Sequence, residues 1–599
     1  MDHPLLRVHP PVAPETAMLY ARPAGGPPPA HEGGLLLKQG QRLSLDTYFG
    51  AFYESLYARY TQVDTVAYLL DLEGRFRITL NRTLADGHVQ RLLEEEREGT
   101  PATPVRLPLP SLRGPDKGRG RLGVELECLA PEGVWRGASV VSASPPPRKV
   151  RLGIILCTYR KEAYLKRTLD TLLTDQRLAQ ESFSILVVDN GGTLDPADLS
   201  DPRVRLIPNR NLGGSGGFGR GLIEALHEPG LTHFLFMDDD IALDSEAVAR
   251  LFPLFAYARG DLAVAGGMLD LLAPTRLFEA GARYSPLVSY PLKQGLDLTE
   301  PSSLDALLRE ERIDYGGFWF FAFSRGLVQR IGGVMPFFIK VDDMEFGLRI
   351  GATAETPIVA FPGIGVWHEP FYAKIPIWDI YYYTRNNLVA NAIHAKASRM
   401  EILTGLSRRV VGRLLLFDYN AVEMLLRGLE DYLKGPDGLR RLDPETWHAG
   451  IIAASRAHES SRQPVEREAS AHPPEDIPSS SIPLFTRLAA LLTLNGHLLP
   501  RILLKGGAVY VSDSPRNWPR IFGHSEVRFH NPHSGAFRSR LDRRLGLQML
   551  RRWIGLSRRA FSTWRATTDA WREAAPELRS ESFLREYYGF RPLKEDRHA

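Results

Sequence analysis

The feature that most constrains the fold is a series of short apolar runs between residues 150 and 240, separated by helix-like stretches. The runs read KVRLGIILCTYR, FSILVVDNGG, RVRLIPN and THFLFMDDD. Continuous apolar runs of this length are typical of parallel strands that are buried on both faces. The alternation predicts a doubly wound, Rossmann-like α/β domain whose ligands bind beyond the carboxyl ends of the strands.

The chain of 599 residues is too long for one ordinary hydrophobic core, so several domains are expected. Proline and glycine are frequent near the start, β-prone runs follow, the stretch SASPPPRK marks a boundary, and amphipathic helical patterns dominate after Lys396. We therefore predict an irregular lead-in at 1–39, a β-sandwich or barrel at 40–147, the α/β domain at 148–395, and a helical domain at 396–599 with a mobile polar linker near 455–482.

Composition excludes several classes of protein. The two cysteines, Cys128 and Cys157, cannot by themselves form a disulfide framework or a thiolate zinc site, so the reducing cytoplasm is the expected compartment. No secretory leader pattern and no apolar run long enough to cross a bilayer is present in the sequence. The net charge of +4 is small for this length and gives no indication of nucleic acid binding.

The segment 538–559 reads RSRLDRRLGLQMLRRWIGLSRR, in which apolar residues are interleaved among arginines. Such a basic amphipathic pattern can attach a protein to the inner face of the cell membrane through anionic lipids. The alternative is a helix that packs on its own domain through its apolar stripe. The pattern alone slightly favours the packed helix.

An acidic triplet, Met237-Asp238-Asp239-Asp240-Ile241, ends the fourth apolar run. Asp238 and Asp240 lie two positions apart, so their side chains can point to the same side of an extended chain, with Asp239 pointing the other way. A hard divalent cation such as Mn²⁺ or Mg²⁺ would offset the repulsion between the two carboxylates. A solvated acidic turn is an equally weighted alternative.

A glycine loop precedes this triplet, and Gly214, Gly216 and Gly219 spell G-x-G-x-x-G before a helix. With Asp238 as the ribose-binding acid, the loop would indicate a nicotinamide-dependent oxidoreductase. Two features weigh against that interpretation: the loop follows the third strand rather than the first, and the acid is a triplet rather than a single residue.

Two further motifs carry polar groups in aromatic surroundings. FFIKVDDMEFG contains three acids, Asp342, Asp343 and Glu345, which are candidates for a general base or for the acidic first turn of a helix. VWHEP contains Trp367 and His368. The imidazole is either a third metal ligand or a packed, hydrogen-bonded histidine.

In order along the chain, CTYRK, VVDNGG, NLGGSGGFGRG, MDDDI, FIKVDDMEFGLR and VWHEP resemble the family-2 glycosyltransferases with a GT-A fold. Within that family the sequence is most similar to the polymerising galactofuranosyltransferases of the mycobacterial cell wall. The resemblance covers about 150–390 by motif. It implies a metal site at Asp238, Asp240 and His368, and Asp343 as the base that acts on the acceptor.

The same resemblance implies contacts with the nucleotide and with the sugars. The residues expected at the nucleotide are Arg160, Lys161, Asp189, Asn211, Gly213, Gly214 and Asp239. Those expected at the donor sugar or acceptor are Glu279, Phe318, Trp319, Asp342, Glu345 and Trp367. The chain departs from the family pattern at Val341 and at Phe318, where tryptophan is expected, and both departures concern the acceptor.

The expected function is that of a metal-dependent, inverting glycosyltransferase. It would move galactofuranose from UDP-galactofuranose to a hydroxyl of a lipid-linked or growing cell-surface glycan, working in the cytoplasm or on the inner membrane face. Three alternatives stay open: a family-2 transferase with another donor such as a rhamnosyl nucleotide, a nicotinamide-dependent oxidoreductase, and a non-catalytic glycan-binding relative. The sequence leaves homo-oligomer formation undecided.

Overall fold

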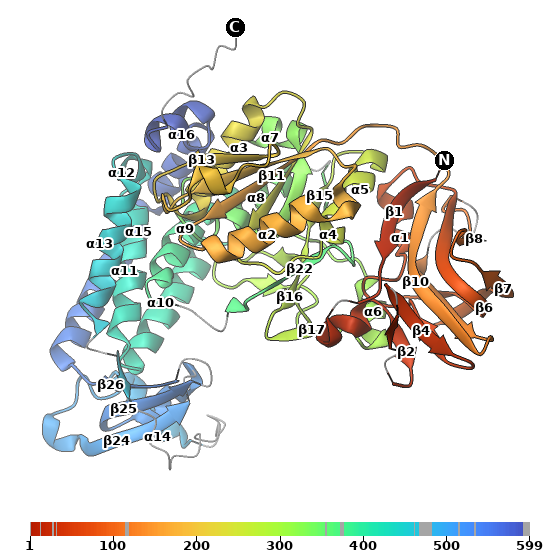
Figure 1. The fold of residues 1–599 in the computed structure, drawn as a ribbon. Coiled ribbons are helices and arrows are strands. Elements are labelled where there is room, and N and C mark those ends of the chain that lie inside the picture. The colour runs from red at the N-terminus through yellow and green to blue at the C-terminus, as the bar shows by residue number, and fades with distance from the viewer. Residues whose placement is uncertain are drawn as a thin grey trace, which may run out of the picture.

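The chain folds into three parts that lie side by side, shown in Figure 1 as an N-terminal sheet, a central α/β domain and a C-terminal helical region. The structure is a computed structural model. It describes residues 2–11, 13–26, 29–31, 33–113, 119–353, 356–371, 376–459, 462–465, 482–512, 515–531 and 535–590.

The N-terminal part is built on one strongly bent, largely antiparallel sheet. Its strands are β1 (His3–Val8), β2 (Arg22–Ala24), β3 (Ala30–His31), β4 (Gly34–Lys38), β5 (Arg42–Ser44), β6 (Val66–Leu84), β7 (Val89–Gly99), β8 (Val105–Pro108), β9 (Gly120–Cys128) and β10 (Glu132–Ser142). The prediction of an irregular lead-in at 1–39 is wrong, because β1 pairs with β10 and β4 pairs with the same strand.

The central sheet has the order β13-β12-β11-β14-β20-β15-β21, with the first four strands parallel and β20 antiparallel to β14. The strands are β11 (Leu152–Thr158), β12 (Phe183–Asp189), β13 (Val204–Pro208), β14 (His233–Asp238), β15 (Ala263–Ala265), β20 (Phe320–Ser324) and β21 (Ile358–Val359). The chain order reverses between β11 and β14, so the carboxyl ends of these two strands flank the crevice where such sheets bind ligands. The predicted α/β class is confirmed.

Alternate residues of the central strands enter two different cores, which is why the sequence shows continuous apolar runs. Leu235 and Met237 of β14 pack in a core shared with the N-terminal sheet, whereas Phe234 and Phe236 pack on the opposite face. The opposite face is covered by α3 (Gly213–His227), α7 (Arg325–Ile331) and α8 (Asp342–Ala352). Helix α2 (Glu162–Thr174) contributes Leu165, Leu169 and Leu172 to the shared core.

A small three-stranded sheet adjoins the carboxyl end of β14. It consists of β16 (Gly267–Asp270), β17 (Ala273–Glu279) and β22 (Gly365–His368), in the order β17-β16-β22. Parallel pairing sets His368 opposite Asp270, so both residues end their strands at the same edge.

The C-terminal region is mainly helical, as predicted. Its main helices are α9 (Asp379–His394), α10 (Arg399–Leu415), α11 (Tyr419–Leu433), α13 (Pro444–Arg456), α15 (Arg543–Leu578) and α16 (Glu581–Tyr587). Met549, Trp553 and Leu556 of α15 are buried against α9–α11. The apolar stripe of 538–559 is therefore packed on its own domain, and it is not available as a membrane anchor. Among the described helices, none has the length and apolarity needed to cross a membrane.

A small lobe extends from the helical region at the lower left of Figure 1, and it contains a sheet that was not predicted from the sequence. The strands are β23 (Arg462–Val465), β24 (Lys505–Ser512), β25 (His524–Asn531) and β26 (Gly535–Arg540), accompanied by α14 (Leu484–Leu492) and the one-turn helix η7 (Arg501–Leu503). The helix predicted through 538–540 is in fact the end of β26. Most of the predicted linker at 455–482 lies outside the described residues.

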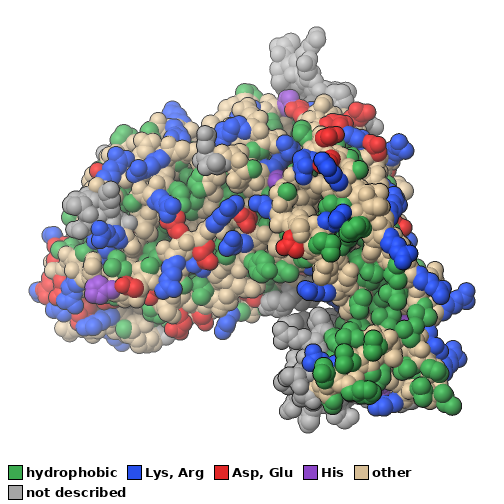
Figure 2. Space-filling model, turned by 180° about the vertical axis from the view of Figure 1, so that it is seen from behind, with side chains coloured by type: hydrophobic (Ala, Val, Ile, Leu, Met, Phe, Trp, Pro, Cys, Tyr) green, Lys and Arg blue, Asp and Glu red, His purple; other side chains and the backbone are tan. Residues whose placement is uncertain are grey.

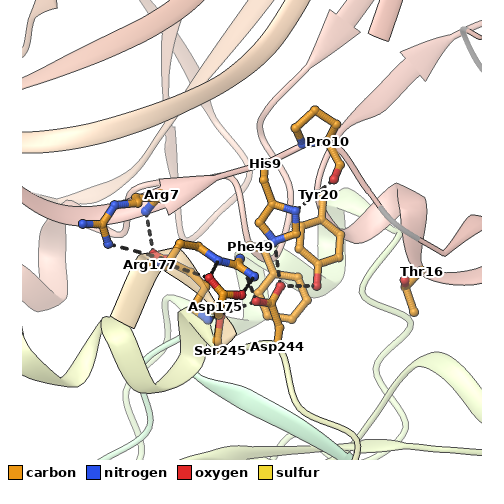
Figure 3. Close-up of polar contacts among 12 residues, drawn as sticks. Arg7, His9, Pro10, Thr16, Tyr20, Phe49, Asp175, Arg177, Asp244 and Ser245 are labelled. Atoms are coloured by element: carbon orange, nitrogen blue, oxygen red, sulfur yellow. Dashed lines mark hydrogen bonds and ion pairs between the residues drawn. The ribbon is translucent and has the colours of Figure 1, made fainter. Parts of the chain in front are cut away.

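A buried polar cluster joins the N-terminal segment to the central domain (Figure 3). The carboxylate of Asp244 accepts hydrogen bonds from Tyr20 Oη at 2.7 Å and Arg177 Nη1 at 2.9 Å, and it lies 2.8 Å from His9 Nε2. Burial opposes ionisation of Asp244, but His9 and Arg177 outweigh it and lower its pKa. Asp244 comes four residues after Asp240, so this cluster holds the chain that follows the acidic triplet.

Replacing Asp244 with Ala should destabilise the protein, because the cluster would then contain unpaired buried groups. Removing one partner of a buried ion pair costs about 3–5 kcal/mol, and this loss is expected in denaturant unfolding of the N-terminal and central parts. The matched control is Asp437→Ala, which removes an exposed partner of Arg440 and should cost less than about 1 kcal/mol. Equal losses for both variants would show that the cluster does not join the two parts.

Candidate active site

Three potential metal ligands converge at the carboxyl end of β14. Ligand atoms of Asp238, Asp240 and His368 all lie within 4.8 Å of one another. His368 Nε2 is 3.3 Å from Asp240 Oδ1 and 3.8 Å from Asp238 Oδ2. Two carboxylates and one imidazole form a donor set that suits Mn²⁺, and also Mg²⁺ when water completes the shell.

Backbone pairing brings these ligands together from distant parts of the chain. Ala242 and Trp367 exchange two hydrogen bonds, N to O at 2.8 Å and 3.0 Å, which tie the segment after β14 to β22. On the other side, Asp238 is in register with Cys157 at the end of β11. Lys161, which follows β11, donates a hydrogen bond to Asp240.

The charges at the triad call for a cation. Burial and the neighbouring Asp240 raise the pKa of Asp238 to about 6. Burial would also raise the pKa of Asp240, but His368 and Lys161 outweigh it and lower that pKa. Because paired buried carboxylates are costly without positive charge, the residues present fit a divalent ion.

A cavity of about 560 Å³ opens beside the triad. It is lined by Gly214, Phe218, Asp238, Phe278, Glu279, Ser289, Pro291, Tyr315, Phe318, Trp319, Ile339, Lys340, Val341, Asp342, Asp343, Met344, Phe371, Pro376, Trp378, Asp379 and Tyr383. One triad ligand, Asp238, thus shares a cavity with Asp343. The volume is in the range that small-molecule sites occupy.

Two carboxyl groups of this cavity have pKa values well above the usual range of carboxylic acids. Burial, with the adjacent Asp342, raises the pKa of Asp343 to about 7. Burial, with the charge of Asp343, raises the pKa of Glu279 to about 8. Glu279 is only 4% exposed and its Oε1 has no hydrogen-bond partner among the described residues. Perturbed carboxyl groups in a cleft are typical of acid–base or substrate-binding sites.

The loop that leads into α8 is backbone-strained. Phe338, Lys340 and Val341 have φ of 73°, 65° and 71°, in the left-handed region that residues with a Cβ rarely adopt. Asn386 of α9 holds the loop by donating from Nδ2 to the carbonyl oxygens of Ile339 and Lys340, both at 2.8 Å. Strain that the surroundings impose in this way is common at functional sites.

The glycine loop packs directly against this strained loop. Gly213 has φ of +65°, and a Cβ there would lie 2.1 Å from the carbonyl oxygen of Phe338. Ser215 Oγ donates to Asp342 Oδ2 at 2.9 Å. Two later glycines of α3 allow close packing on the sheet: a Cβ on Gly217 would lie 2.1 Å from Cys157 Sγ, and one on Gly221 would lie 2.4 Å from Ile155 Cγ2.

This arrangement differs from a dinucleotide-binding fingerprint. The glycines lie inside α3, which follows the edge strand β13 rather than the first strand of the unit. Of the loop, Gly214 lines the cavity, and a Cβ there would meet open space. The geometry therefore contradicts the oxidoreductase alternative.

The predicted nucleotide residues surround the carboxyl ends of β11 and β12. The Asp189 carboxylate accepts hydrogen bonds from four backbone amides between Gly191 and Leu194, at 2.8–3.0 Å, so it shapes that turn. Asn211 Oδ1 accepts a hydrogen bond from Gly213 N at 3.2 Å. Arg160 is exposed and lies over the ring of Tyr159. Asp239 is buried, and burial raises its pKa to about 7.

Two predicted substrate residues lie elsewhere. Glu345 is fully buried and pairs with Arg349 at 2.9 Å and with His394 at 3.2 Å, so it joins α8 to α9 instead of lining the cavity. Trp367 points away from the cavity, since its indole Nε1 donates to Pro274 O at 2.9 Å and its ring packs on Phe49. Both assignments are corrected to structural roles.

The cavity residues that were not predicted from the sequence include Lys340, Trp378 and Tyr383. Lys340 lies 3.3 Å from Asp379 Oδ2 and beneath the ring of Tyr383, and it supplies a positive charge to the cavity. Trp378 adds an aromatic wall. Lys340 lies in the same motif as the candidate acids Asp342 and Asp343. The aromatic run IWDIYYY was the sequence signal that could have indicated Trp378 and Tyr383.

Comparison with known families identifies the class of this domain. Residues 147–381 match the family described as glycosyltransferase-like family 2, and residues 32–111 match the galactofuranosyltransferase 2 N-terminal family. Residues 147–381 are therefore a family-2-like glycosyltransferase domain, and residues 32–111 before it resemble the N-terminal domain of galactofuranosyltransferases. The resemblance seen in the sequence is confirmed.

Individual relatives carry the same names. Galactofuranosyltransferase GlfT2 of Mycolicibacterium smegmatis is 28% identical over 436 residues, which cover 66% of this chain and 65% of that protein. Its counterpart from Mycobacterium tuberculosis is 28% identical over 427 residues, covering 66% of each chain. The matched part thus spans just under two thirds of the length of these relatives.

Among solved structures, a mannosyltransferase from Pyrobaculum calidifontis, in complex with GDP-Man and Mn²⁺, is 15% identical. It covers 53% of this chain and 89% of its own, with a TM-score of 0.30. A likeness this low says nothing about the ligands of the present chain.

The triad predicts selective loss of metal binding. Asp240→Asn and His368→Ala should each weaken Mn²⁺ binding at least 10- to 100-fold, the loss seen when even a partner of a ligand is removed. Titration calorimetry with Mn²⁺ alone measures this. Asp239→Asn is the matched control, because Asp239 does not belong to the triad, and it should bind Mn²⁺ like the parent. A strong loss in the control would place the ion elsewhere on the acidic segment.

The strained loop predicts a role for Asn386 that is separate from metal binding. Asn386→Ala removes both hydrogen bonds to Ile339 and Lys340, so amide hydrogens of residues 338–343 should exchange faster while Mn²⁺ binding is kept. Asn387→Ala is the control, since Asn387 Nδ2 donates within α9 to Tyr383 O. Unchanged exchange in the Asn386 variant would mean that the loop holds its conformation without this clamp.

Proposed function

We infer that the protein transfers a galactofuranosyl residue from UDP-galactofuranose to a hydroxyl of a growing or lipid-linked glycan at the cytoplasmic membrane face. One observation carries the proposal: Asp238 of the metal-ligand triad lines the same cavity as Asp343, a carboxyl group whose pKa is raised to about 7. The matches to galactofuranosyltransferases support the donor. A rhamnosyl or other nucleotide sugar is the remaining alternative.

Asp238, Asp240 and His368 would hold Mn²⁺ or Mg²⁺, and the ion supplies positive charge for the diphosphate of the donor. Lys161 is within reach of the same diphosphate, because it already contacts Asp240. Gly214 leaves room for the donor to approach the start of α3. Arg160 and the turn shaped by Asp189 are proposed to border the uridine.

Asp343 is proposed as the general base. Its carboxylate takes the proton of the acceptor hydroxyl while that oxygen bonds to the anomeric carbon, and the bond from this carbon to the UDP oxygen breaks. UDP leaves with the bonding electrons, Asp343 is left protonated, and a single displacement inverts the anomeric configuration. A pKa of about 7 suits this task, since the group is partly ionised at neutral pH yet basic enough to accept the proton.

Glu279 and the aromatic residues are proposed to hold the sugars. Trp319 and Tyr383 face the cavity, where aromatic surfaces suit the apolar faces of sugar rings. The unpartnered Oε1 of Glu279 is a hydrogen-bond acceptor for a sugar hydroxyl. Asp342 already accepts a hydrogen bond from Ser215 Oγ, which fixes the start of α8, so its proposed role is to position the neighbouring Asp343.

Asp343→Asn should separate catalysis from donor binding. Transfer is expected to fall by roughly 10²–10⁴-fold, the usual effect of losing an acid–base group, while UDP affinity in Mn²⁺ is unchanged. Transfer is measured with UDP-galactofuranose beside UDP-galactopyranose and a rhamnosyl nucleotide. The parent rate should also rise with pH through about 7, because only the ionised Asp343 accepts a proton, and the variant should lose this rise.

Asp342→Asn is the matched control for the adjacent carboxyl group. If Asp343→Asn is active and Asp342→Asn is inactive with UDP binding intact, the base is Asp342. If both variants transfer normally, the acids form only the first turn of α8 and the proposed mechanism fails. If the parent uses another nucleotide sugar as well as UDP-galactofuranose, the donor assignment is wrong, and the assignment of the base is unaffected.

A further inference from the structure

The end of the described chain returns to the central domain and packs on the glycine loop. Helix α16 follows α15 after a short turn and lies beside α3 at the top of Figure 1. Three buried side chains of this segment share one apolar cluster with two buried side chains of the glycine loop and α3: Leu584, Tyr588 and Phe590 with Leu212 and Ile223. Residues 579–590 thus form a C-terminal clasp that joins the helical region to the loop at the edge of the cavity.

Polar contacts hold the clasp on two elements of the central domain. The backbone N of Gly333, in the turn after α7, donates to the carbonyl oxygen of Arg579 at 3.0 Å. Glu581 Oε1 lies 2.6 Å from His227 Nε2 at the end of α3. The turn after α7 leads along the chain into the strained loop at 338–341, and the start of α3 packs against the same loop. The clasp therefore bridges the two elements that support the strained loop.

The ring of Tyr588 packs against the face of α3 that carries two glycines. A Cβ on Gly216 would lie 3.4 Å from Cε1 and Cζ of Tyr588, and a Cβ on Gly219 would lie 4.0 Å from its Cε2. Tyr588 is 2% exposed, and its hydroxyl has no hydrogen-bond partner among the described residues. Burial, with the charges of Tyr587 and Asp342, raises the pKa of this hydroxyl, so it stays neutral. The contact of Tyr588 with α3 is therefore a packing contact of its ring.

Ser215 connects this packing contact to the proposed base. It lies next to the glycine that the Tyr588 ring contacts, and it is fully buried. Its backbone N donates to Phe338 O at 3.0 Å, and its Oγ donates to Asp342 Oδ2 at 2.9 Å. Asp343 follows directly in the first turn of α8. One turn of α3 thus contacts the clasp, the strained loop and the acid pair.

We propose that Tyr588 is a positioning residue for transfer: its ring holds the first turn of α3, and through Ser215 that turn holds the acid pair at the start of α8. The inference rests on the proposed function, since it concerns the alignment of the general base. A misplacement of about 1 Å can slow a reaction about 10²-fold, so even a small shift of this turn is measurable. The metal ligands lie at the ends of β14 and β22 rather than on α3, so donor binding should depend little on the clasp.

The test uses three changes in the full chain and one control. Tyr588→Ala removes the ring, Tyr588→Phe keeps it, and Ser215→Ala removes the hydrogen bond to Asp342. The matched control is Phe529→Ala, which removes a buried ring from the small lobe, at the lower right of Figure 2 and far from α16. Transfer from UDP-galactofuranose to a soluble acceptor is expressed per UDP-binding site, counted by calorimetry in Mn²⁺, so that unfolded protein does not contribute. Amide hydrogen exchange of residues 212–220 is measured without substrate.

Tyr588→Ala should lower kcat about 10- to 100-fold, with the KM for the donor and the UDP affinity close to those of the parent. Amides of residues 212–220 should exchange faster in this variant. Tyr588→Phe should match the parent in both measurements, because the ring makes the contact, and Phe529→Ala should match the parent per UDP-binding site. In a double-mutant cycle, Tyr588→Ala should add little to Ser215→Ala, because both changes act through the same turn.

Three results would overturn the proposal. A kcat of Tyr588→Ala equal to that of the parent would leave the clasp with a purely structural role. An equal loss in Tyr588→Phe and Tyr588→Ala would show that the ring is not the acting group. Fully additive losses in the cycle would separate Tyr588 from Ser215. If the parent transfers no sugar from any nucleotide, the proposed function fails, and the exchange of residues 212–220 still decides whether the clasp holds α3.

Discussion

Two backbone hydrogen bonds between Ala242 and Trp367 hold the active site together. They fix the chain after β14, a strand of the central sheet, against β22, a strand of the small sheet, and so bring the two aspartates of the triad to His368. Just beyond this contact, the buried cluster around Asp244 ties the same segment to the N-terminal sheet. The metal ligands therefore lie where the central sheet, the small sheet and the N-terminal domain meet, and each of the three parts constrains their positions.

The site concentrates energetically unfavourable features that the surrounding fold sustains. Asp238, Glu279 and Asp343 have raised pKa values because burial penalises their charged forms. Val341 adopts a left-handed backbone conformation, which costs roughly 1–2 kcal/mol for a residue with a Cβ. Helix α9 offsets part of this through Asn386, and the close approach of Gly213 fixes the other side of the loop. Carboxyl groups with raised pKa values and a strained backbone at one place are typical of a functional site, where the fold is shaped for a reaction rather than for stability.

The central sheet and the acidic triplet could be predicted because their signals are local. Continuous apolar runs identify buried strands, and strand ends place the acids. Strand β1 was missed because its partner β10 lies far along the chain, and a short strand gives little local signal by itself. Two other errors were avoidable. Successive strand residues face opposite sides, so if His368 faces the acids, Trp367 must face away. Glu345 and Arg349 have the i,i+4 spacing of an ion pair on a helix.

The structure also shows what phenylalanine at position 318, where the family pattern has tryptophan, contributes to the site. Its ring contacts four other phenylalanine rings, Phe218, Phe236, Phe321 and Phe346, at centroid distances of 4.7–6.2 Å, so it packs in the core behind the sheet while it also lines the cavity. Trp319 instead packs against Phe371, at 5.8 Å, on the cavity side. Because the ring at 318 packs in this core and also lines the cavity beside the ring at 319, phenylalanine in place of tryptophan at 318 alters the packing behind the proposed acceptor site as well as its surface. Differences in acceptor choice are then expected to arise from Trp319, Phe371 and Lys340.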